Sequence, residues 1–275
     1  MDAKEISNSG FISLRDNIEF LPRWRNSSNV LCNYMRKKEY LQRIIRMKAI
    51  TPRYNIEPMG YLGIENHNRL CFPMTCFCDI PFSKVATHMS RYGEYGIGFS
   101  KESLLKRHHV QPIHYINPDS PLASDFKEAI LAAEKDKITS EGLELTLLNY
   151  LTTTLLYMKP IYGYESKDSG EQVFINYQDE CEWRYIPTSF PENLKLIIGQ
   201  NRSTDITKET YSDALANHPE CWIDFNWDDV IYLIVPDEVA AKEIISTIME
   251  LNISPQEKYL LISKIEISKH FSENM

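Results

Sequence analysis

The sequence predicts an α+β fold, in which strands and helices follow one another in irregular order. Short strand-like runs are interleaved with segments whose apolar residues recur at helical spacing. No internal repeat, low-complexity segment or linker interrupts the 275 residues. A content of 43% hydrophobic and 25% charged residues is ordinary for a globular chain with an ample core. We expect a single domain over 1–275, with 1–30 as an N-terminal arm and 190–275 either as a C-terminal extension or as the far side of the domain.

The expected elements follow from hydrophobic periodicity and from turn residues. Outside the stretch 71–101, strands are expected at 30–35, 111–116, 173–177, 181–187, 194–198, 230–235 and 260–267. Helices are expected at 37–50, 102–108, 204–216 and 237–251, and as two pieces of 120–158 hinged near 139–142. A polar loop is expected at 165–172.

Residues 71–101 form the most distinctive stretch, because cysteine, aromatic and glycine residues are densest there. A strand is expected at 72–80 and Pro81 ends it, after which Ser83 can cap a short helix. A loop and a second strand follow at 92–99. Glycine weakens strands but lets a backbone approach a ligand closely. We therefore interpret this stretch as the floor and rim of a pocket.

Charge and cysteine usage limit the classes of function. The net charge is −8, but residues 1–53 hold 11 Lys and Arg against 5 Asp and Glu. A basic N-terminal segment permits local nucleic-acid binding, and the alternative is a solvated helix face. No run approaches the roughly 18 apolar residues of a membrane span, and the polar N-terminus is not a signal peptide. The six cysteines are too sparse for a disulfide scaffold, so we expect buried thiols and a cytoplasmic protein without a membrane partner.

A second informative stretch, residues 177–187, contains closely spaced carboxylates and an arginine. Because strand side chains alternate between faces, Glu180, Glu182 and Arg184 would share one face. One interpretation is an exposed strand face with a cross-paired Glu and Arg. The other is a cleft carboxylate that stabilises an oxocarbenium-like centre, as glycosyl-transferring enzymes require. Two neighbouring carboxylates would also separate in pKa, so that one could act as a base.

Several motifs together resemble a known family. They are LCNYM (31–35), EYL (39–41), PRY (52–54), PMTCFCDIP (73–81), His88, YGEYGIG (92–98), QPIHY (111–115) and EWR (182–184). This set resembles the AbiGi-type abortive-infection proteins of bacterial antiphage systems, over residues 30–190. The resemblance implies a role in antiphage defence.

By the layout of its elements the chain also resembles, more distantly, ADP-ribosyltransferase toxins of the DarT kind, which move ADP-ribose from NAD onto nucleic acid. This implies an ADP-ribosyltransferase-like mixed sheet core with flanking helices. It implies that Glu182 holds the ribose 2′-hydroxyl of NAD as nicotinamide leaves, and that Glu180 orients or deprotonates the acceptor. The residues implied for NAD binding are Asn33, Tyr34, Arg53, Tyr54, Phe77, Asp79 and Tyr92. The family's histidine for the nicotinamide ribose is absent at positions 33 and 34.

The acceptor that we expect is nucleic acid, most of all single-stranded RNA. Basic residues suit its phosphates, and nearby aromatic rings can stack unpaired bases. The basic set is Arg36, Lys37, Lys38, Arg43, Arg46 and Arg184. The Glu-x-Glu spacing is also similar to that of transferases that modify guanidinium groups, so a protein acceptor remains an alternative. A toxin needs restraint in its host, so we expect a cognate antitoxin as partner.

Two other interpretations compete with the enzyme. The missing histidine favours a non-catalytic antitoxin, sensor or binding protein that keeps the fold without turnover. Cys71, Cys76, Cys78 and His88 could in principle ligate zinc, but no C-x-x-C pair is present, and we predict no metal site.

Overall fold

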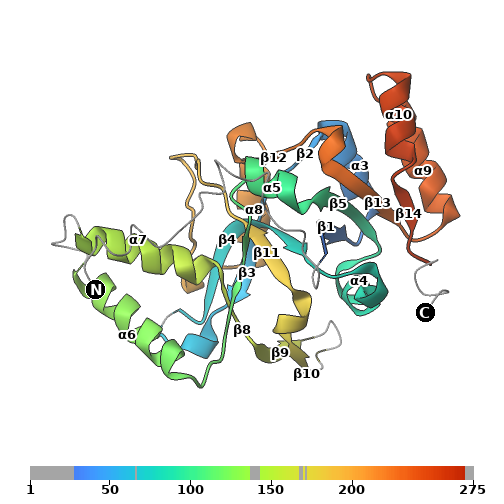
Figure 1. Cartoon of the computed structure of the whole chain (residues 1–275). Coiled ribbons are helices and arrows are strands. Elements are labelled where there is room, and N and C mark those ends of the chain that lie inside the picture. The colour runs from blue at the N-terminus through green and yellow to red at the C-terminus, as the bar shows by residue number, and fades with distance from the viewer. Residues whose placement is uncertain (1–27, 66, 137–142, 167–169, 171, 270–275) are drawn as a thin grey trace, which may run out of the picture.

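A computed structural model describes residues 28–65, 67–136, 143–166, 170 and 172–269. One large mixed sheet runs through the middle of this part of the chain (Figure 1). A two-helix arm projects on one side, and the C-terminal helices cover the other. The predicted α+β class is confirmed.

The main sheet has eight strands, and seven of them lie in a row. In spatial order these are β14 (Ile265–Ile267), β13 (Val230–Val235), β5 (Tyr95–Ser100), β1 (Val30–Met35), β4 (Arg69–Cys78), β11 (Glu182–Tyr185) and β6 (Gln111–Pro112). The eighth, β3 (Arg53–Pro58), pairs with β4 off this row. Only β13 and β14 pair in parallel within the sheet. The C-terminal strands thus form one edge of the sheet that β1 and β4 also build.

Smaller sheets and helices surround this sheet. The two-stranded sheets pair β2 (Ala49–Ile50) with β12 (Ile223–Asp224), β7 (His114–Ile116) with β8 (Met158–Pro160), and β9 (Tyr162–Ser166) with β10 (Gln172–Asn176). The described α-helices are α3 (Lys38–Met47), α4 (Ala86–Tyr92), α5 (Lys101–Arg107), α6 (Pro121–Asp136), α7 (Leu143–Leu156), α8 (Asp205–Leu215), α9 (Glu238–Met249) and α10 (Pro255–Ile262). A short 3-10 helix, η4 (Tyr177–Glu180), leads into β11.

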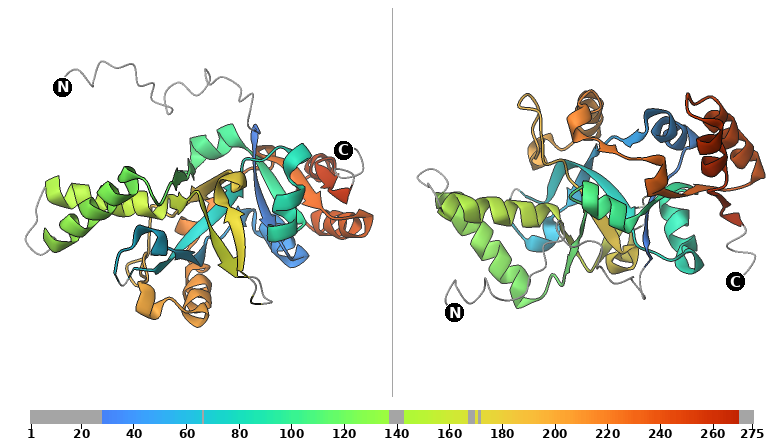
Figure 2. Two further views of the ribbon diagram at one scale, coloured as in Figure 1. Left: turned by 90° about the horizontal axis from the view of Figure 1, so that it is seen from below. Right: turned by 45° about the horizontal axis from the view of Figure 1, so that its top comes forward.

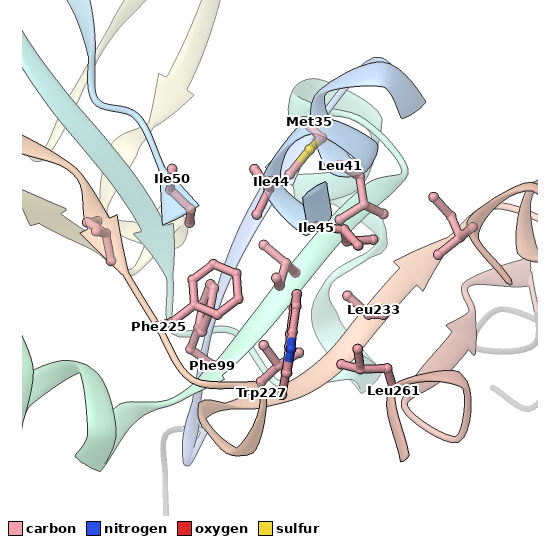
Figure 3. Close-up of a cluster of buried hydrophobic side chains, with 14 of the residues drawn as sticks. Met35, Leu41, Ile44, Ile45, Ile50, Phe99, Phe225, Trp227, Leu233 and Leu261 are labelled. Carbon is pink, nitrogen blue, oxygen red and sulfur yellow. The ribbon is translucent and has the colours of Figure 1, made fainter. Parts of the chain in front are cut away.

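The larger apolar core lies between the sheet and the helices α3 and α9 (Figure 3). Leu41, Ile44 and Ile45 recur at helical spacing on α3, and all three are buried. They belong to one cluster with Phe99 of β5 and Leu233 of β13. Burying a side chain of this size stabilises the fold by about 1.5–3 kcal/mol, so this face fixes α3 on the sheet.

A second core lies where the two-helix arm meets β4. Phe72 and Met74 of β4 are buried in one cluster with Phe126 of α6 and Leu151 and Leu155 of α7. Turned views show the two helices leaving the sheet together (Figure 2). The predicted pair of helices within 120–158 is confirmed; the hinge expected near 139–142 falls outside the described residues.

Two glycines of the stretch 71–101 lie against the strand β1. Gly93 has φ +116°, and a Cβ there would lie 2.2 Å from the Met35 carbonyl oxygen. A Cβ on Gly98 would lie 2.9 Å from the Val30 side chain. The close backbone approach that we predicted toward a ligand is made to β1 instead. For these glycines the pocket-rim interpretation was wrong, because glycine serves strand packing equally well. Other residues of the same stretch, among them Phe82, Met89 and Glu94, do line a surface hollow.

Three N-terminal boundaries differ from the prediction. The helix α3 ends at Met47, because Lys48 is left-handed with φ 52°, and the next two residues form β2. Ser83 is not a helix cap: it lies in a 3-10 turn, and Val85 precedes α4. The predicted strand 111–116 is divided at Ile113, where the chain passes from the main sheet to the β7–β8 pair.

Three C-terminal predictions also need correction, and several strands were not predicted. Cys181 is left-handed with φ 44°, so the strand begins at Glu182. The segment 194–198 is not a strand and makes only a bridge from Ile198 to Cys71. The predicted strand 260–267 is shorter than expected: its first three residues belong to α10, which a Ser254–Glu257 capping box begins, and only Ile265–Ile267 form the strand β14. The strands β3, β8 and β9 were not predicted, and β9 enters the expected polar loop.

Candidate functional site

Six charged side chains form a continuous series of ion pairs beside β11. In order they are Arg91, Glu180, Lys159, Glu182, Arg184 and Glu57, which we call the buried ion-pair chain. The nitrogen–oxygen distances along it are 3.1, 2.6, 3.1, 2.6 and 2.7 Å. Three cations alternate with three anions, so the series is neutral as a whole. Such pairing is what makes charges tolerable in the interior.

Five separate elements build the buried ion-pair chain. The strand β11 supplies Glu182 and Arg184, which are two residues apart and therefore share a face. The other members are Lys159 from β8, Glu180 from η4, Arg91 from α4 and Glu57 from β3. Glu180 and Glu182 lie close together, as predicted. This proximity arises through Lys159, which pairs with both, and not from strand alternation.

Both carboxylate oxygens of Glu182 accept hydrogen bonds from cations. Oε1 accepts from Arg184 Nε at 2.6 Å, and Oε2 accepts from Lys159 Nζ at 3.1 Å. The Glu182 amide donates to the hydroxyl of Tyr115 at 2.9 Å. Burial opposes ionisation of this carboxyl, but Arg184 and Lys159 outweigh it and lower the pKa of Glu182 to about 2. The side chain is therefore a fully paired carboxylate at neutral pH.

Glu180 is equally enclosed. Its Oε1 accepts from the hydroxyl of Tyr92 at 2.7 Å and faces Arg91, while its Oε2 accepts from Lys159 at 2.6 Å. Lys159 also lies over the ring of Tyr177, 4.8 Å from its centroid. Burial would lower the pKa of Lys159, but the surrounding glutamates raise it well above its usual value. The ammonium group thus stays charged between two carboxylates.

Arg184 is fully buried, with 0% of its surface exposed. Its Nη2 donates to Glu57 at 2.7 Å, and its Nη1 donates to the Leu156 carbonyl at 2.9 Å. The guanidinium also lies 5.9 Å from the ring centroid of Phe72. The exposed strand face that we considered for Glu182 and Arg184 is therefore wrong. Arg184 does not reach the surface, so we remove it from the predicted nucleic-acid-binding set.

An aromatic layer covers one end of the buried ion-pair chain. The imidazole of His88 lies between Tyr34, at 5.6 Å between centroids, and Tyr92, at 4.5 Å. Burial is the main reason that the pKa of His88 is lowered to about 4, with Arg91 adding to it. His88 is therefore neutral at physiological pH. Tyr34 and Tyr92, two of the predicted NAD contacts, meet at this ring.

The other predicted NAD contacts lie apart from this layer or are engaged elsewhere. Asn33 donates from its amide to the Cys76 carbonyl at 2.8 Å. Arg53 is exposed and pairs with Glu209 on α8. The remaining three are internal: Tyr54 donates its hydroxyl to the Lys195 carbonyl, Phe77 packs against Phe99, and Asp79 pairs with the buried Lys101 at 2.6 Å. The structure does not bring the predicted NAD set together.

The predicted basic surface lies on and before α3. Lys38 pairs with Glu243 at 2.7 Å and Arg46 with Glu250 at 3.3 Å, so α9 neutralises two of the five remaining cations. Arg36 donates to the Arg91 carbonyl. The last two cations, Lys37 and Arg43, are exposed. Lys37 directly precedes α3 and lies over the ring of Tyr40, whereas Arg43 lies within α3 and donates to the sulfur of Met47.

Two surface hollows are lined by other residues. A hollow of about 490 Å³ lies between α4 and the C-terminal edge, and one of about 260 Å³ lies beside α10. Neither lining includes a member of the buried ion-pair chain.

Among the described residues, no group of three or more His, Cys, Asp or Glu is placed to hold a metal ion. In the same part of the chain, every helix is too short or too polar to cross a membrane. Cys181 is exposed, contrary to the expected burial of all six cysteines.

Residues 48–236 match the model of a protein family described as "Putative abortive phage resistance protein AbiGi, antitoxin". The chain belongs to the AbiGi family. It is also 29% identical over 250 residues to the "Abortive phage resistance protein AbiGi" of Lactococcus lactis subsp. cremoris, covering 82% of this chain and 99% of that protein. The chain is thus an abortive-infection protein of antiphage defence, and the AbiGi resemblance is confirmed. The matched region begins later than predicted and runs past residue 190. No solved structure matches the chain significantly.

Sequence reasoning found the two glutamates and Tyr92 but missed most of their partners. Lys159 lies in a short Met-Lys-Pro strand that carries no motif. Glu57 lies on β3, a strand that was not predicted. Arg184, the direct partner of Glu182, was found in the Glu-Trp-Arg motif, and His88 was noticed as one of the family motifs.

Proposed function

We propose that this chain is the antitoxin of an abortive-infection system, a binding protein that restrains a cognate toxin. The matching family model is described as an antitoxin, and the lactococcal relative is named for phage resistance. Neither name specifies a catalysed reaction. The net charge of −8 suits a protein that binds another protein better than one that binds nucleic acid over most of its surface.

One observation carries this proposal: both carboxylate oxygens of Glu182 are held by cations of the chain itself. A glutamate that stabilises a developing positive charge must present an unneutralised oxygen to the substrate. Here Arg184 and Lys159 already compensate its negative charge. The arrangement supports a structural role, in which the buried ion-pair chain ties β11 to β3, β8 and α4.

Neutralisation in cells tests the proposal. The product of the gene adjacent to that of this chain is induced in a bacterial host, with and without the chain. We expect the adjacent product alone to arrest growth, and the chain to restore growth and co-purify with it. Glu182→Gln, verified as folded by circular dichroism, is expected to neutralise as well as the wild type. Growth arrest caused by the chain alone would contradict the proposal.

A second candidate is a NAD-dependent ADP-ribosyltransferase toxin that acts on single-stranded RNA. The observation that favours it is that Glu182, at the start of β11, belongs to the same ion-pair chain as Glu180. Tyr92 donates a hydrogen bond to Glu180, and the neutral His88 packs against the ring of Tyr92. In this candidate Tyr92 would stack on nicotinamide. Lys159 would have to release Glu182 when NAD binds.

Labelled NAD separates the two candidates. The purified chain is incubated with NAD and, in parallel, with RNA, single-stranded DNA or total protein. The antitoxin proposal predicts no transfer of label and no heat of NAD binding. Transfer to one acceptor that is lost in a folded Glu182→Gln variant would instead establish the transferase and identify its substrate class.

A further inference from the structure

The larger of the two surface hollows, which we call the α4 hollow, has a volume of about 490 Å³. It lies between α4 and the C-terminal edge of the main sheet, where Figure 1 shows α4 next to β14. Its volume is within the range of ligand sites in proteins, roughly 300–1,000 Å³. The buried ion-pair chain takes no part in its lining. The α4 hollow is therefore separate from the residues around Glu182.

The inner part of the α4 hollow is apolar and firmly held. Val85, directly before α4, and Met89 within it are both buried. The half-buried ring of Phe82 packs against Tyr232, with 4.7 Å between the ring centroids. Pro236 lines the opposite side, where β13 ends. Such a lining suits a ligand with a hydrocarbon part.

One buried polar group also lines the α4 hollow. Ser268 is 8% exposed, and its amide donates to the Val235 carbonyl at 2.8 Å, which holds it at the end of β14. Within the described part of the chain, the hydroxyl of Ser268 has no hydrogen-bond partner. Buried hydroxyl groups are nearly always paired. An unpaired one in the wall of a hollow indicates a ligand that forms hydrogen bonds there.

Two carboxylates at the α4 hollow have no cationic partner. Glu94 is exposed just before β5, and Asp237 is the N-cap of α9, where its Oδ1 accepts from the Ala240 amide at 2.8 Å. Among the described residues, no Lys, Arg or His forms an ion pair with either carboxylate. Lys269 adds one positive charge to the lining, against these two negative charges. The hollow thus has a net negative lining in a chain of net charge −8, and it attracts cations.

Arginine is the cation that fits these groups together. Its three-carbon stem can lie on apolar residues while the charged head stays near the rim. Its planar guanidinium has five donors, enough for the Ser268 hydroxyl and both carboxylates, and it stacks on aromatic faces such as that of Phe82. The ammonium group of lysine has three donors and no plane to stack. Arginine is also enriched among the side chains that anchor protein interfaces.

We propose that the α4 hollow receives an arginine side chain of a partner protein, with the guanidinium between Glu94 and Asp237 and the stem against Met89. Electrostatic complementarity favours a basic segment on the partner of an acidic chain. That this partner is the cognate toxin rests on the antitoxin function proposed above. The arginine site itself does not depend on that function.

Methyl NMR of the full chain, labelled at its 9 methionines, tests the arginine site directly. The probe is N-acetyl-arginine methylamide, and N-acetyl-citrulline methylamide is the uncharged control of nearly the same shape. We expect the arginine probe to shift the Met89 methyl signal and to leave that of Met249, which is 51% exposed on α9, in place. The citrulline probe is expected to shift neither. Equal shifts with both probes, or no shift with either, would overturn the proposal.

Three variants separate charge from shape. Glu94→Gln is expected to weaken binding of the arginine probe about tenfold, because a charge-assisted hydrogen bond is lost. Glu192→Gln is the matched control, since Glu192 is exposed but outside the lining, and it should bind as the wild type does. Ala86→Trp, at an exposed position of the lining, fills the hollow and is expected to abolish binding. Undiminished binding by a folded Ala86→Trp variant would place the probe elsewhere and refute the site.

Calorimetry with the product of the adjacent gene tests the partner. We expect Ala86→Trp to bind it at least about tenfold more weakly than the wild type, and Glu192→Gln to bind it equally well. If the wild type and Ala86→Trp bind it with the same affinity, the docking proposal is wrong and the antitoxin function stands. If the wild type does not bind it, the antitoxin function fails, and the two probes alone decide whether the α4 hollow is an arginine site.

Discussion

The buried ion-pair chain and the contact between α3 and α9 use the same chemistry in two settings. In the interior, Arg184 is fully buried and both of its acidic partners are largely enclosed. At the surface, Lys38 pairs with Glu243 and Arg46 with Glu250, and these four side chains are 36–64% exposed. Water solvates a surface charge whether or not it is paired, whereas the interior provides no substitute for a lost partner. An ion pair is therefore optional on α3 and obligatory on β11.

This difference determines which charges are available to a partner molecule. Lys38 and Arg46 can exchange a carboxylate of α9 for another anion at little cost, because both states are solvated. Arg184 cannot, since its departure would leave the largely enclosed Glu57 without its cation and the buried Glu182 with Lys159 alone. Charge runs that are alike in the sequence thus divide into surface groups that can bind and interior groups that hold the fold.

The largest effect is expected for Arg184→Met. This change leaves Glu57 and Glu182 without their shared cation, and breaking a buried ion pair from one side costs about 3–5 kcal/mol. We expect a loss of that size in the free energy of unfolding, measured with urea. Arg43→Met on the exposed face of α3 is the control and should change stability little. A loss for Arg184→Met no larger than the control's would show that water reaches the site.

A smaller effect is expected in the pH dependence of stability, through Glu182. Its pKa is lowered from 4.5 to about 2 in the folded chain. Its contribution is therefore present above pH 4.5 and is lost as the pH falls from 4.5 toward 2. We expect urea unfolding to show a shallower decline over this window in Glu182→Gln than in the wild type. Parallel curves for the two proteins would mean that Glu182 titrates normally and is not held by Arg184.

The smallest effect is expected for Arg46→Met at the α3–α9 contact. Its pair with Glu250 is 3.3 Å long and half exposed, and such pairs contribute at most about 1 kcal/mol. Thermal unfolding in low and high salt should show a small loss that salt abolishes by screening. A loss comparable to that of Arg184→Met would erase the distinction between the two regions.

The parts of the fold that follow from local periodicity were predictable. The strand β1 and the helix α8 lie where apolar spacing and turn residues placed them. Errors arose where one residue changed the backbone, as the left-handed Cys181 did before β11. They also arose in short strands such as β8, because three residues are too few to show a period. The capping box at Ser254 and Glu257 is a readable signal for the start of α10, a helix that was not predicted.

The sequence by itself determined the α+β class, the AbiGi motifs and the two glutamates before and at the start of β11. Those follow from residue types and from spacing along one segment. Only the tertiary structure decided that the glutamates are buried and neutralised, because Lys159 and Glu57 come from strands distant in the sequence. The charge state and the role of a carboxylate depend on which cations lie within a few ångströms, and packing brings them there. Alternation along a strand can place Glu182 and Arg184 on one face, but it does not say whether that face meets water.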